Sequence, residues 1–199
     1  MRNIYTDLKH QVAIVTGGSQ GIGAATAVTM GRAGAIVVLT YNQSKPKALK
    51  VLHEIKQAGV PAIALHLDLQ NRESIHLMVS ETLKKFGRID MLINNAAVGS
   101  ASVSHYTSLE KQDQAMVEIN VHGALLCVQG VLPVMADQNY GKIINVSSVG
   151  GGISAFPHFR MSDGMSKASV SFLSKQIVAD YPHHRIDAFS ICPGAVDTR

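Results

Sequence analysis

Short apolar runs alternate with longer amphipathic segments along this chain. The runs are rich in valine, isoleucine and alanine, and they fall at residues 12–15, 36–39, 62–67, 91–93, 143–146 and 188–191. Unbroken apolar runs of this length are typical of strands that are buried on both faces of a parallel sheet. We therefore expect six such strands.

The segments between these runs have helical spacing, with apolar residues recurring every three or four positions. They fall at residues 24–33, 48–58, 75–86, 116–135 and 166–180. Pro133 is expected to bend or end the fourth helix. The regular alternation predicts an α/β fold of the Rossmann type, a doubly wound parallel sheet between two helical layers with right-handed crossovers. Nothing marks a second domain, so we expect residues 1–199 to form one.

Composition narrows the class of protein. Hydrophobic residues make up 46% of the chain and charged residues 16%, which excludes a disordered chain. No stretch matches the length of an apolar membrane span, and the polar N-terminus does not resemble a secretion signal. Cys127 and Cys192 lack metal-type spacing and suit reduced thiols, so we expect a cytoplasmic protein.

The charged and titratable residues exclude two kinds of partner. The net charge is +4, but the basic residues are scattered and are not interleaved with aromatic side chains that would stack on bases. The nine histidines form no cluster apart from His183–His184, and HExxH is absent. We therefore expect neither nucleic acid nor a metal among the partners of this chain, and the lack of an apolar span noted above predicts no membrane either.

The strongest local signal is the segment TGGSQGIG at residues 16–23, which follows the first apolar run and opens a helix. Glycine allows a sharp turn and lets a ligand approach the backbone. The free N–H groups at the start of a helix, together with its dipole, favour an anion. The segment therefore predicts a site for the diphosphate of a dinucleotide.

This segment resembles the glycine fingerprint of the short-chain dehydrogenases/reductases. The resemblance continues in order from about residue 10 to residue 199, through Asp68-Leu69, residues 94–97 (NNAA), Asn120, Ser147-Ser148, Lys167 and residues 193–198 (PGAVDT). Within that family the chain resembles 3-oxoacyl-acyl-carrier-protein reductases and glucose dehydrogenases. The resemblance implies an NAD(P)(H)-dependent oxidoreductase that interconverts an alcohol and a carbonyl compound by hydride transfer.

The same resemblance implies the residues that hold the coenzyme. They are Gly17, Ser19, Gln20, Gly21, Ile22 and Gly23 in the glycine segment, Tyr41, Asn42 and Ser44 after the second strand, Asp68, Leu69, Asn94 and Ala96 along the adenosine, and Lys167, Pro193, Gly194, Val196 and Thr198 at the nicotinamide end. Two of these have structural alternatives: Asp68 as a helix N-cap, and Asn94–Asn95 as an ordinary turn.

The residues after the second strand favour NADP(H) over NAD(H). NAD-specific relatives usually carry an acidic residue there, which binds the ribose hydroxyls and repels a 2′-phosphate. Tyr41 stands at that position, Asn42 and Ser44 can donate hydrogen bonds, and Lys45 adds positive charge. Gln20 occupies the place where relatives often have an arginine.

The catalytic set implied by the resemblance is broken at one position. Asn120, Ser148 and Lys167 match three of its four residues, but Asp163 stands where the family has its tyrosine. An ordinary carboxyl group is ionised at neutral pH and is a poor general acid. Asp163 therefore suggests an ion pair with Lys167 one turn away, or an N-cap formed with Ser162.

Two further expectations concern the loop before Asp163. The glycines at residues 150–152 suggest mobility or a backbone that passes close to a ligand. His158 is a candidate replacement proton donor, with a solvent-facing loop histidine as the alternative.

Two hypotheses of function follow. The first is an oxidoreductase acting on a small-molecule carbonyl or alcohol, with its proton supplied by a replacement group or by a water relayed through Asn120 and Lys167. The second is an NAD(P)-binding module with little redox activity, a sensor, scaffold or part of a larger polypeptide. By the family's habit we expect a homo-oligomer, a dimer or tetramer, built through helices 116–135 and 166–180. Family members are usually longer, with a substrate loop and a last strand beyond residue 199.

Overall fold

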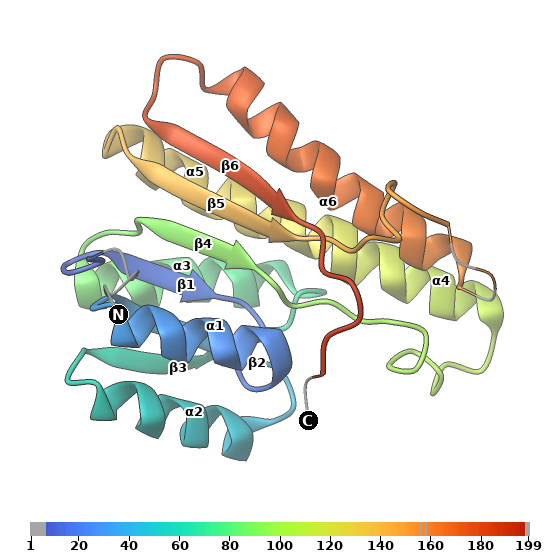
Figure 1. The fold of residues 1–199 in the computed structure, drawn as a ribbon, viewed down its shortest axis with the longest axis horizontal. Helices are drawn as coiled ribbons and strands as arrows, with labels where there is room; N and C mark the ends of the chain where they lie inside the picture. The colour runs from blue at the N-terminus through green and yellow to red at the C-terminus, as the bar shows by residue number, and fades with distance from the viewer. Residues whose placement is uncertain (1–6, 156, 158, 198–199) are drawn as a thin grey trace, which may run out of the picture.

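A single parallel sheet organises the chain. The computed structural model describes residues 7–155, 157 and 159–197. The strands are β1 (Val12–Val15), β2 (Ile36–Tyr41), β3 (Ala62–His66), β4 (Met91–Asn94), β5 (Gly141–Val146) and β6 (Ile186–Ile191). Their order across the sheet is β3-β2-β1-β4-β5-β6, and every neighbouring pair is parallel (Figure 1). The predicted doubly wound sheet is confirmed.

Helices cover both faces of this sheet. They are α1 (Gly21–Arg32), α2 (Lys45–Gln57), α3 (Arg72–Phe86), α4 (Leu109–Val117), the π-helical turn η1 (Glu118–Gly123), α5 (Ala124–Asp137) and α6 (Met161–Asp180). Helices α1 and α2 lie on one face, and α3, α5 and α6 lie on the other (Figure 1). The result is the predicted arrangement of three layers.

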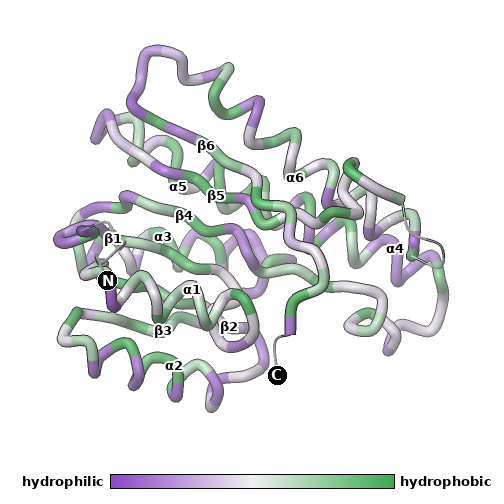
Figure 2. The backbone as a smooth tube through the Cα atoms, viewed as in Figure 1, coloured by the Kyte–Doolittle hydropathy of each residue, from purple (hydrophilic) through white to green (hydrophobic). Residues whose placement is uncertain are grey.

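The central strands are apolar throughout because each of their faces meets a different core. Ala13 and Val15 of β1 pack in the core beneath α1 and α2. Val12 and Ile14 point the other way, into the core beneath α3, α5 and α6. Side chains alternate across a strand, so two buried faces require an unbroken apolar run. Figure 2 shows hydrophobic residues along the middle of the sheet.

The longest helix differs from its prediction. It runs without a break from Leu109 to Asp137 through α4, η1 and α5, beginning seven residues before the predicted start at residue 116. Pro133 lies inside α5 and does not end it. By length and composition alone this helix could cross a membrane, contrary to our expectation that no segment would qualify. Half of its apolar window is buried within the described structure, as in a core helix.

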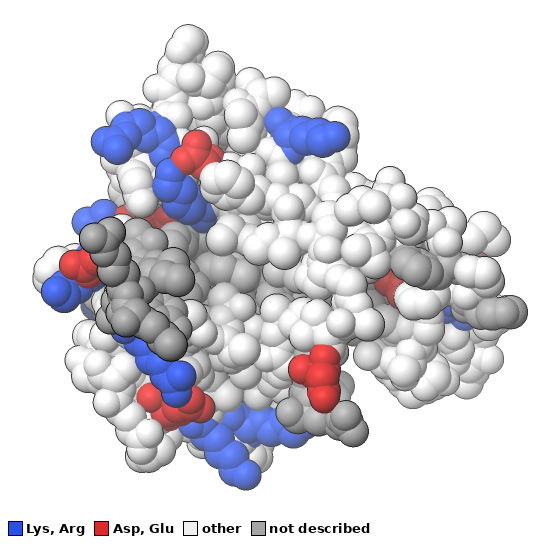
Figure 3. All heavy atoms as spheres, in the orientation of Figure 1, with Lys and Arg blue, Asp and Glu red and all other residues white. Residues whose placement is uncertain are grey.

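One face of β5 and β6 carries no helix. Ile144 and Val146 lie beside Phe189 and Ile191 on the face that α1 and α2 cover elsewhere in the sheet. Phe189 is 53% exposed and Ile191 is 50% exposed. On this side of the molecule, charged side chains lie towards the margins and the middle of the surface is largely uncharged (Figure 3).

Candidate coenzyme-binding and catalytic site

A cleft of about 850 Å³ opens at the carboxyl ends of the central strands. It lies where the strand order reverses between β1 and β4, the place where open α/β sheets bind their ligands. Twelve of the residues predicted to hold the coenzyme line it: Gly17, Ser19, Gln20, Gly21, Ile22, Gly23, Tyr41, Asn42, Ser44, Asp68, Leu69 and Ala96. The structure thus brings together segments that are far apart in the sequence.

The glycine segment forms a cradle that excludes larger residues. A Cβ atom on Gly23 would lie 2.3 Å from the carbonyl oxygen of Gly17 and 2.4 Å from Nδ2 of Asn95. Gly17 has a φ of +65°, and its Cβ would lie 3.0 Å from the Cα of Ala96. Gln20, the N-cap of α1, makes no side-chain capping bond, so the first-turn N–H groups keep no side-chain partner there. This is the donor set that a diphosphate requires.

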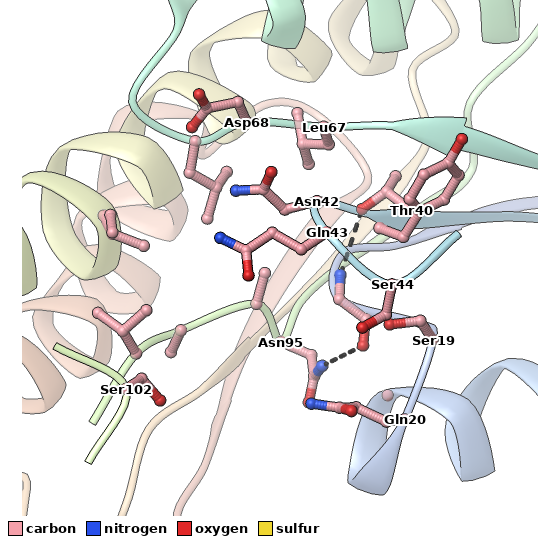
Figure 4. Close-up of a pocket in the computed structure, with 18 of the residues that line it drawn as sticks. Ser19, Gln20, Thr40, Asn42, Gln43, Ser44, Leu67, Asp68, Asn95 and Ser102 are labelled. Carbon is pink, nitrogen blue, oxygen red and sulfur yellow. Dashed lines mark hydrogen bonds between the residues drawn. The ribbon is translucent and has the colours of Figure 1, made fainter. Parts of the chain in front are cut away.

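Hydrogen bonds from β2 and β4 hold the cradle in place. Nδ2 of Asn95 donates to the carbonyl oxygens of Thr16 at 2.9 Å and Gly17 at 3.3 Å. The backbone N–H of Gly17 donates to Oγ1 of Thr40 at 3.2 Å. Asn42 and Gln43 project from the end of β2 between Asp68 and Asn95 (Figure 4). The clamping roles of Asn95 and Thr40 were not predicted, because they depend on which strands are neighbours.

Asp68 lies on the cleft and does not cap a helix. The N-cap of α3 is Asn71, whose Oδ1 accepts from the N–H of Glu73 at 2.9 Å and of Ser74 at 3.3 Å. Oδ1 of Asp68 accepts only from the N–H of Gln70, at 3.0 Å, among the described residues. The alternative interpretation of Asp68 as an N-cap is therefore wrong, and its carboxylate is available to a ligand.

Asn94 was expected along the adenosine, but its side chain is buried in the sheet. Its Nδ2 donates to the carbonyl oxygen of Ala124 at 3.2 Å and to Oδ1 of Asn145 at 3.0 Å. Because successive side chains point to opposite faces of a strand, Asn94 and Asn95 point in different directions at the end of β4. Asn95 lines the cleft and Asn94 does not. Asn94 thus ties β4 to α5 and β5.

The lysine that lines the cleft is not the one expected from the sequence. Tyr41, Asn42 and Ser44 line the cleft there, but Lys45 is absent from its lining. Lys47 lines it instead, and its Nζ donates to Oε1 of Gln20 at 2.8 Å.

Ser148 and Lys167 lie at the end of β5. Oγ of Ser148 accepts from the N–H of Gly150 at 3.2 Å, and no described residue accepts its hydroxyl hydrogen. Nζ of Lys167 donates to the carbonyl oxygen of Val146 at 3.2 Å. Burial lowers the pKa of Lys167, and the charge of Asp163 partly opposes that shift. A lowered pKa brings the amine closer to exchanging protons at neutral pH.

Asp163 lies in the first turn of α6 and is not its cap. The N-cap is Arg160, without a side-chain capping bond, so the proposed cap from Ser162 and Asp163 is wrong. The predicted ion pair with Lys167 is also not formed as a direct contact in the described part of the chain. The two charges interact through space. A carboxylate in this first turn is favoured by the helix dipole.

The side chain of Asn120 links the loop after β4 to α6. Its Oδ1 accepts from the N–H of Val98 at 2.8 Å. Its Nδ2 donates to the carbonyl oxygen of Val98 at 2.9 Å and to Oγ of Ser166 at 3.1 Å. Ser166 in turn donates to the carbonyl oxygen of Asp163 at 2.8 Å. Asn120 therefore positions the first turn of α6, and the water relay through Asn120 and Lys167 stays a prediction.

The loop before α6 is anchored at both ends. A Cβ on Gly151 would lie 2.7 Å from the Cβ of Lys167, so this glycine is needed for close packing against α6. Arg160 donates to Oδ1 of Asp113 at 2.6 and 3.0 Å, and Ser162 donates to the same atom at 2.5 Å. These hydrogen bonds, the one from Ser162 first, lower the pKa of Asp113.

The expected nicotinamide-end residues lie apart from the cleft lining. The carbonyl oxygen of Pro193 accepts from the N–H of Val149 at 3.1 Å, which fixes the chain after β6 beside the Ser148 loop. Val196 lines a second hollow against α1, which shares Gly21 and Ile22 with the cleft, and Gly194 is exposed. His158 and Thr198 lie outside the described residues. No group of three or more metal-type side chains occurs in the part of the chain that the structure describes.

Comparison with known proteins shows what this chain is similar to. The short chain dehydrogenase family matches residues 11–199. A 3-oxoacyl-[acyl-carrier-protein] reductase of Synechocystis sp. is 35% identical over 97% of this chain and 77% of its own length. Glucose 1-dehydrogenase 2 of Bacillus subtilis is 32% identical over 98% of this chain and 75% of its own. The crystal structure of a metagenomic short-chain oxidoreductase in complex with NADP superposes with a TM-score of 0.85 at 32% identity, covering 96% of this chain and 85% of that one.

Proposed function

We propose that this chain, which belongs to the short-chain dehydrogenase family and is an oxidoreductase of that type, uses NADP(H) to interconvert a small-molecule carbonyl compound and its alcohol. The observation that carries the proposal is the glycine cradle at the switch point of the sheet. Gly17 and Gly23 pack too closely against neighbouring protein atoms to accept a side chain, and the N-cap of α1 makes no side-chain capping bond. That one of its structural relatives is in complex with NADP supports the choice of coenzyme.

The residues of the chain supply binding and proton chemistry around the coenzyme, which supplies or accepts the hydride when bound. Ser148 donates its free hydroxyl hydrogen to the oxygen of the substrate and so orients the carbonyl carbon. Lys167 places a cation at the end of β5, where it polarises the same oxygen and holds a proton on Nζ. Since tyrosine is replaced by Asp163, we assign the proton donor to Lys167, directly or through water.

The second candidate function is coenzyme binding without efficient chemistry. Asp163 is the observation that favours it, because a first-turn carboxylate without a described hydrogen-bond donor to its side chain stays an acceptor, not a proton donor. The two functions differ in whether bound NADPH is consumed.

A direct test measures coenzyme uptake and oxidation separately. The unaltered chain should bind NADPH and oxidise it with some members of a panel of ketones and aldehydes. Ser148→Ala should keep NADPH affinity and lose most of the oxidation, by about 100-fold or more if Ser148 contributes as a general acid–base partner does. Binding without oxidation on any carbonyl would refute the enzymatic proposal in favour of the binding module. Absence of saturable uptake by folded protein would refute both.

We also propose a homo-oligomer and a cytoplasmic location. Helices α5 and α6 lie side by side on one face of the sheet, and α6 exposes apolar side chains: Met161 is 86% exposed, Met165 64% and Phe172 62%. Such a stripe on an outer helix suits contact with a second copy of the chain. Two free cysteines, one of them buried, suit a reducing compartment. Light scattering at two protein concentrations tests the oligomer, and a monomer at both would refute it.

A further inference from the structure

Lys47 supplies a positive charge to the lining of the cleft. It is the only lysine or arginine among the described residues that line it. Its Nζ contacts Oε1 of Gln20 at 2.8 Å, and no carboxylate of the described chain forms an ion pair with it. The partner of Lys47 is therefore a neutral amide, so its positive charge remains uncompensated at the mouth of the cleft.

Uncharged donors surround this lysine. Ser19 comes from the glycine segment, and Asn42 and Ser44 follow β2; no described residue accepts a hydrogen bond from any of these side chains. Figure 4 shows Ser19, Gln20 and Ser44 at the same end of the cleft. A phosphate monoester carries a charge of about −1.5 to −2 at neutral pH and three strong acceptor oxygens. One cation and several neutral donors match those needs.

We propose that Lys47, positioned by Gln20, is the residue that distinguishes NADP(H) from NAD(H), by pairing with the 2′-phosphate of the adenosine ribose. The inference rests on the proposed use of NADP(H) and assigns its selectivity to a particular side chain. Lys45 does not share this role. Two residues along an α-helix rotate a side chain by about 200°, so Lys45 and Lys47 leave α2 in nearly opposite directions.

Gln20 has a distinct part in this arrangement. Its Oε1 faces Lys47, so the two hydrogens of its Nε2 remain available to the phosphate. Replacing this amide by a carboxylate of nearly the same shape would convert the contact into an ion pair. Gln20→Glu should therefore cancel the selectivity for the 2′-phosphate although Lys47 is still present, an effect that a purely structural contact would not produce.

The experiment measures dissociation constants of NADPH and NADH by fluorescence titration of the full chain. The variants are Lys47→Ala, Gln20→Glu, and Lys50→Ala as a matched control on α2 outside the cleft. Because Lys47→Ala removes one charged hydrogen bond, we expect it to weaken the binding of NADPH by about 10- to 100-fold. The dissociation constant of NADH should change by no more than about twofold in Lys47→Ala. Lys50→Ala should leave the dissociation constants of both coenzymes unchanged. Because salt screens the attraction between charges, raising the salt concentration should weaken the binding of NADPH less in Lys47→Ala than in the unaltered chain.

The outcomes separate this inference from the proposed function. If the unaltered chain prefers NADPH and Lys47→Ala keeps that preference, the inference is wrong and the proposed coenzyme stands. The inference would also be overturned if Lys47→Ala weakened the binding of NADPH and NADH equally, or if Lys45→Ala selectively weakened the binding of NADPH. If the unaltered chain binds NADH more tightly, or binds neither coenzyme, the proposed use of NADP(H) itself fails.

Discussion

Replacing Gly23 by alanine tests the tightest contact in the cradle. The added Cβ would lie 2.3 Å from the carbonyl oxygen of Gly17, and real Cβ contacts are essentially never shorter than 3.0 Å. The two atoms must therefore separate by at least 0.7 Å, the difference between these distances. Both belong to backbone, so no flexible side chain can give way. The same Cβ meets Nδ2 of Asn95, which binds Thr16 and Gly17.

The change in the free energy of unfolding caused by Gly23→Ala is the sum of opposing effects. Alanine is better than glycine inside a helix by about 1 kcal/mol. Overpacking costs about 1–3 kcal/mol, and displacing Asn95 disturbs two hydrogen bonds at about 1 kcal/mol each. We expect the free energy of unfolding to fall by about 2 kcal/mol net, which lowers Tm by about 4–8 °C for a chain of this size. NADPH affinity should fall by more, about 100-fold, because the N–H groups that face the diphosphate move with the loop.

The assay is a thermal melt with and without saturating NADPH. Bound ligand raises the Tm of the unaltered chain, and Gly23→Ala should show little or no such rise. Gly99→Ala is the matched control, since a Cβ there meets nothing within 4 Å. If Gly23→Ala melted like the control and kept the full rise with NADPH, the reasoning from the close contact would be refuted.

Two other substitutions test the catalytic end of the site. Asp163→Tyr restores a proton donor one turn before Lys167, so NADPH oxidation with simple ketones should rise by about 100-fold or more, whereas Asp163→Asn should give no gain. Asp113→Asn removes the negative charge of the group that accepts hydrogen bonds from Arg160 and Ser162 and leaves a neutral amide oxygen in its place. Because the native pKa of Asp113 is lowered from 3.8, its contribution to stability is present above 3.8 and is lost as the pH falls through the native value. Urea unfolding should therefore show Asp113→Asn less stable than the unaltered chain at neutral pH, with the difference shrinking in acid; an equal difference at both pH values would contradict this.

The central strands could be predicted from the sequence because burial on both faces requires a continuous apolar run. Val12–Val15 matches its prediction residue for residue. The start of the long helix could not be predicted in this way. Its first turns, α4, are mostly polar, and the helix begins where Ser108 accepts a hydrogen bond from the N–H of Lys111. The position of a helix N-cap depends on the backbone conformation of the capping residue, and the spacing of hydrophobic residues carries no information about that conformation.

The residues that line the cleft fall into the same two groups. The place of the glycine segment in the cleft could be predicted, because its residue types are dictated by close contacts with backbone. The place of Lys47 could not be predicted, since the choice between Lys47 and Lys45 depends on the direction in which each leaves α2. Thr40 and Asn95 were missed for a related reason: their hydrogen bonds run between strands that are adjacent in space and distant in sequence.

Hydrogen bonds tie the residues around Lys167 to their neighbours. Oγ of Ser147 donates to the carbonyl oxygen of Lys167 at 2.7 Å, and Nδ2 of Asn120 donates to Oγ of Ser166 at 3.1 Å. Among the described residues, the hydroxyl hydrogen of Ser148 has no acceptor, and burial lowers the pKa of Lys167. The groups to which we assign the orientation of a carbonyl and the exchange of a proton are therefore both present, which favours the enzymatic proposal over the binding module. Within that proposal, the difference from the family's pattern is the atom that delivers the proton.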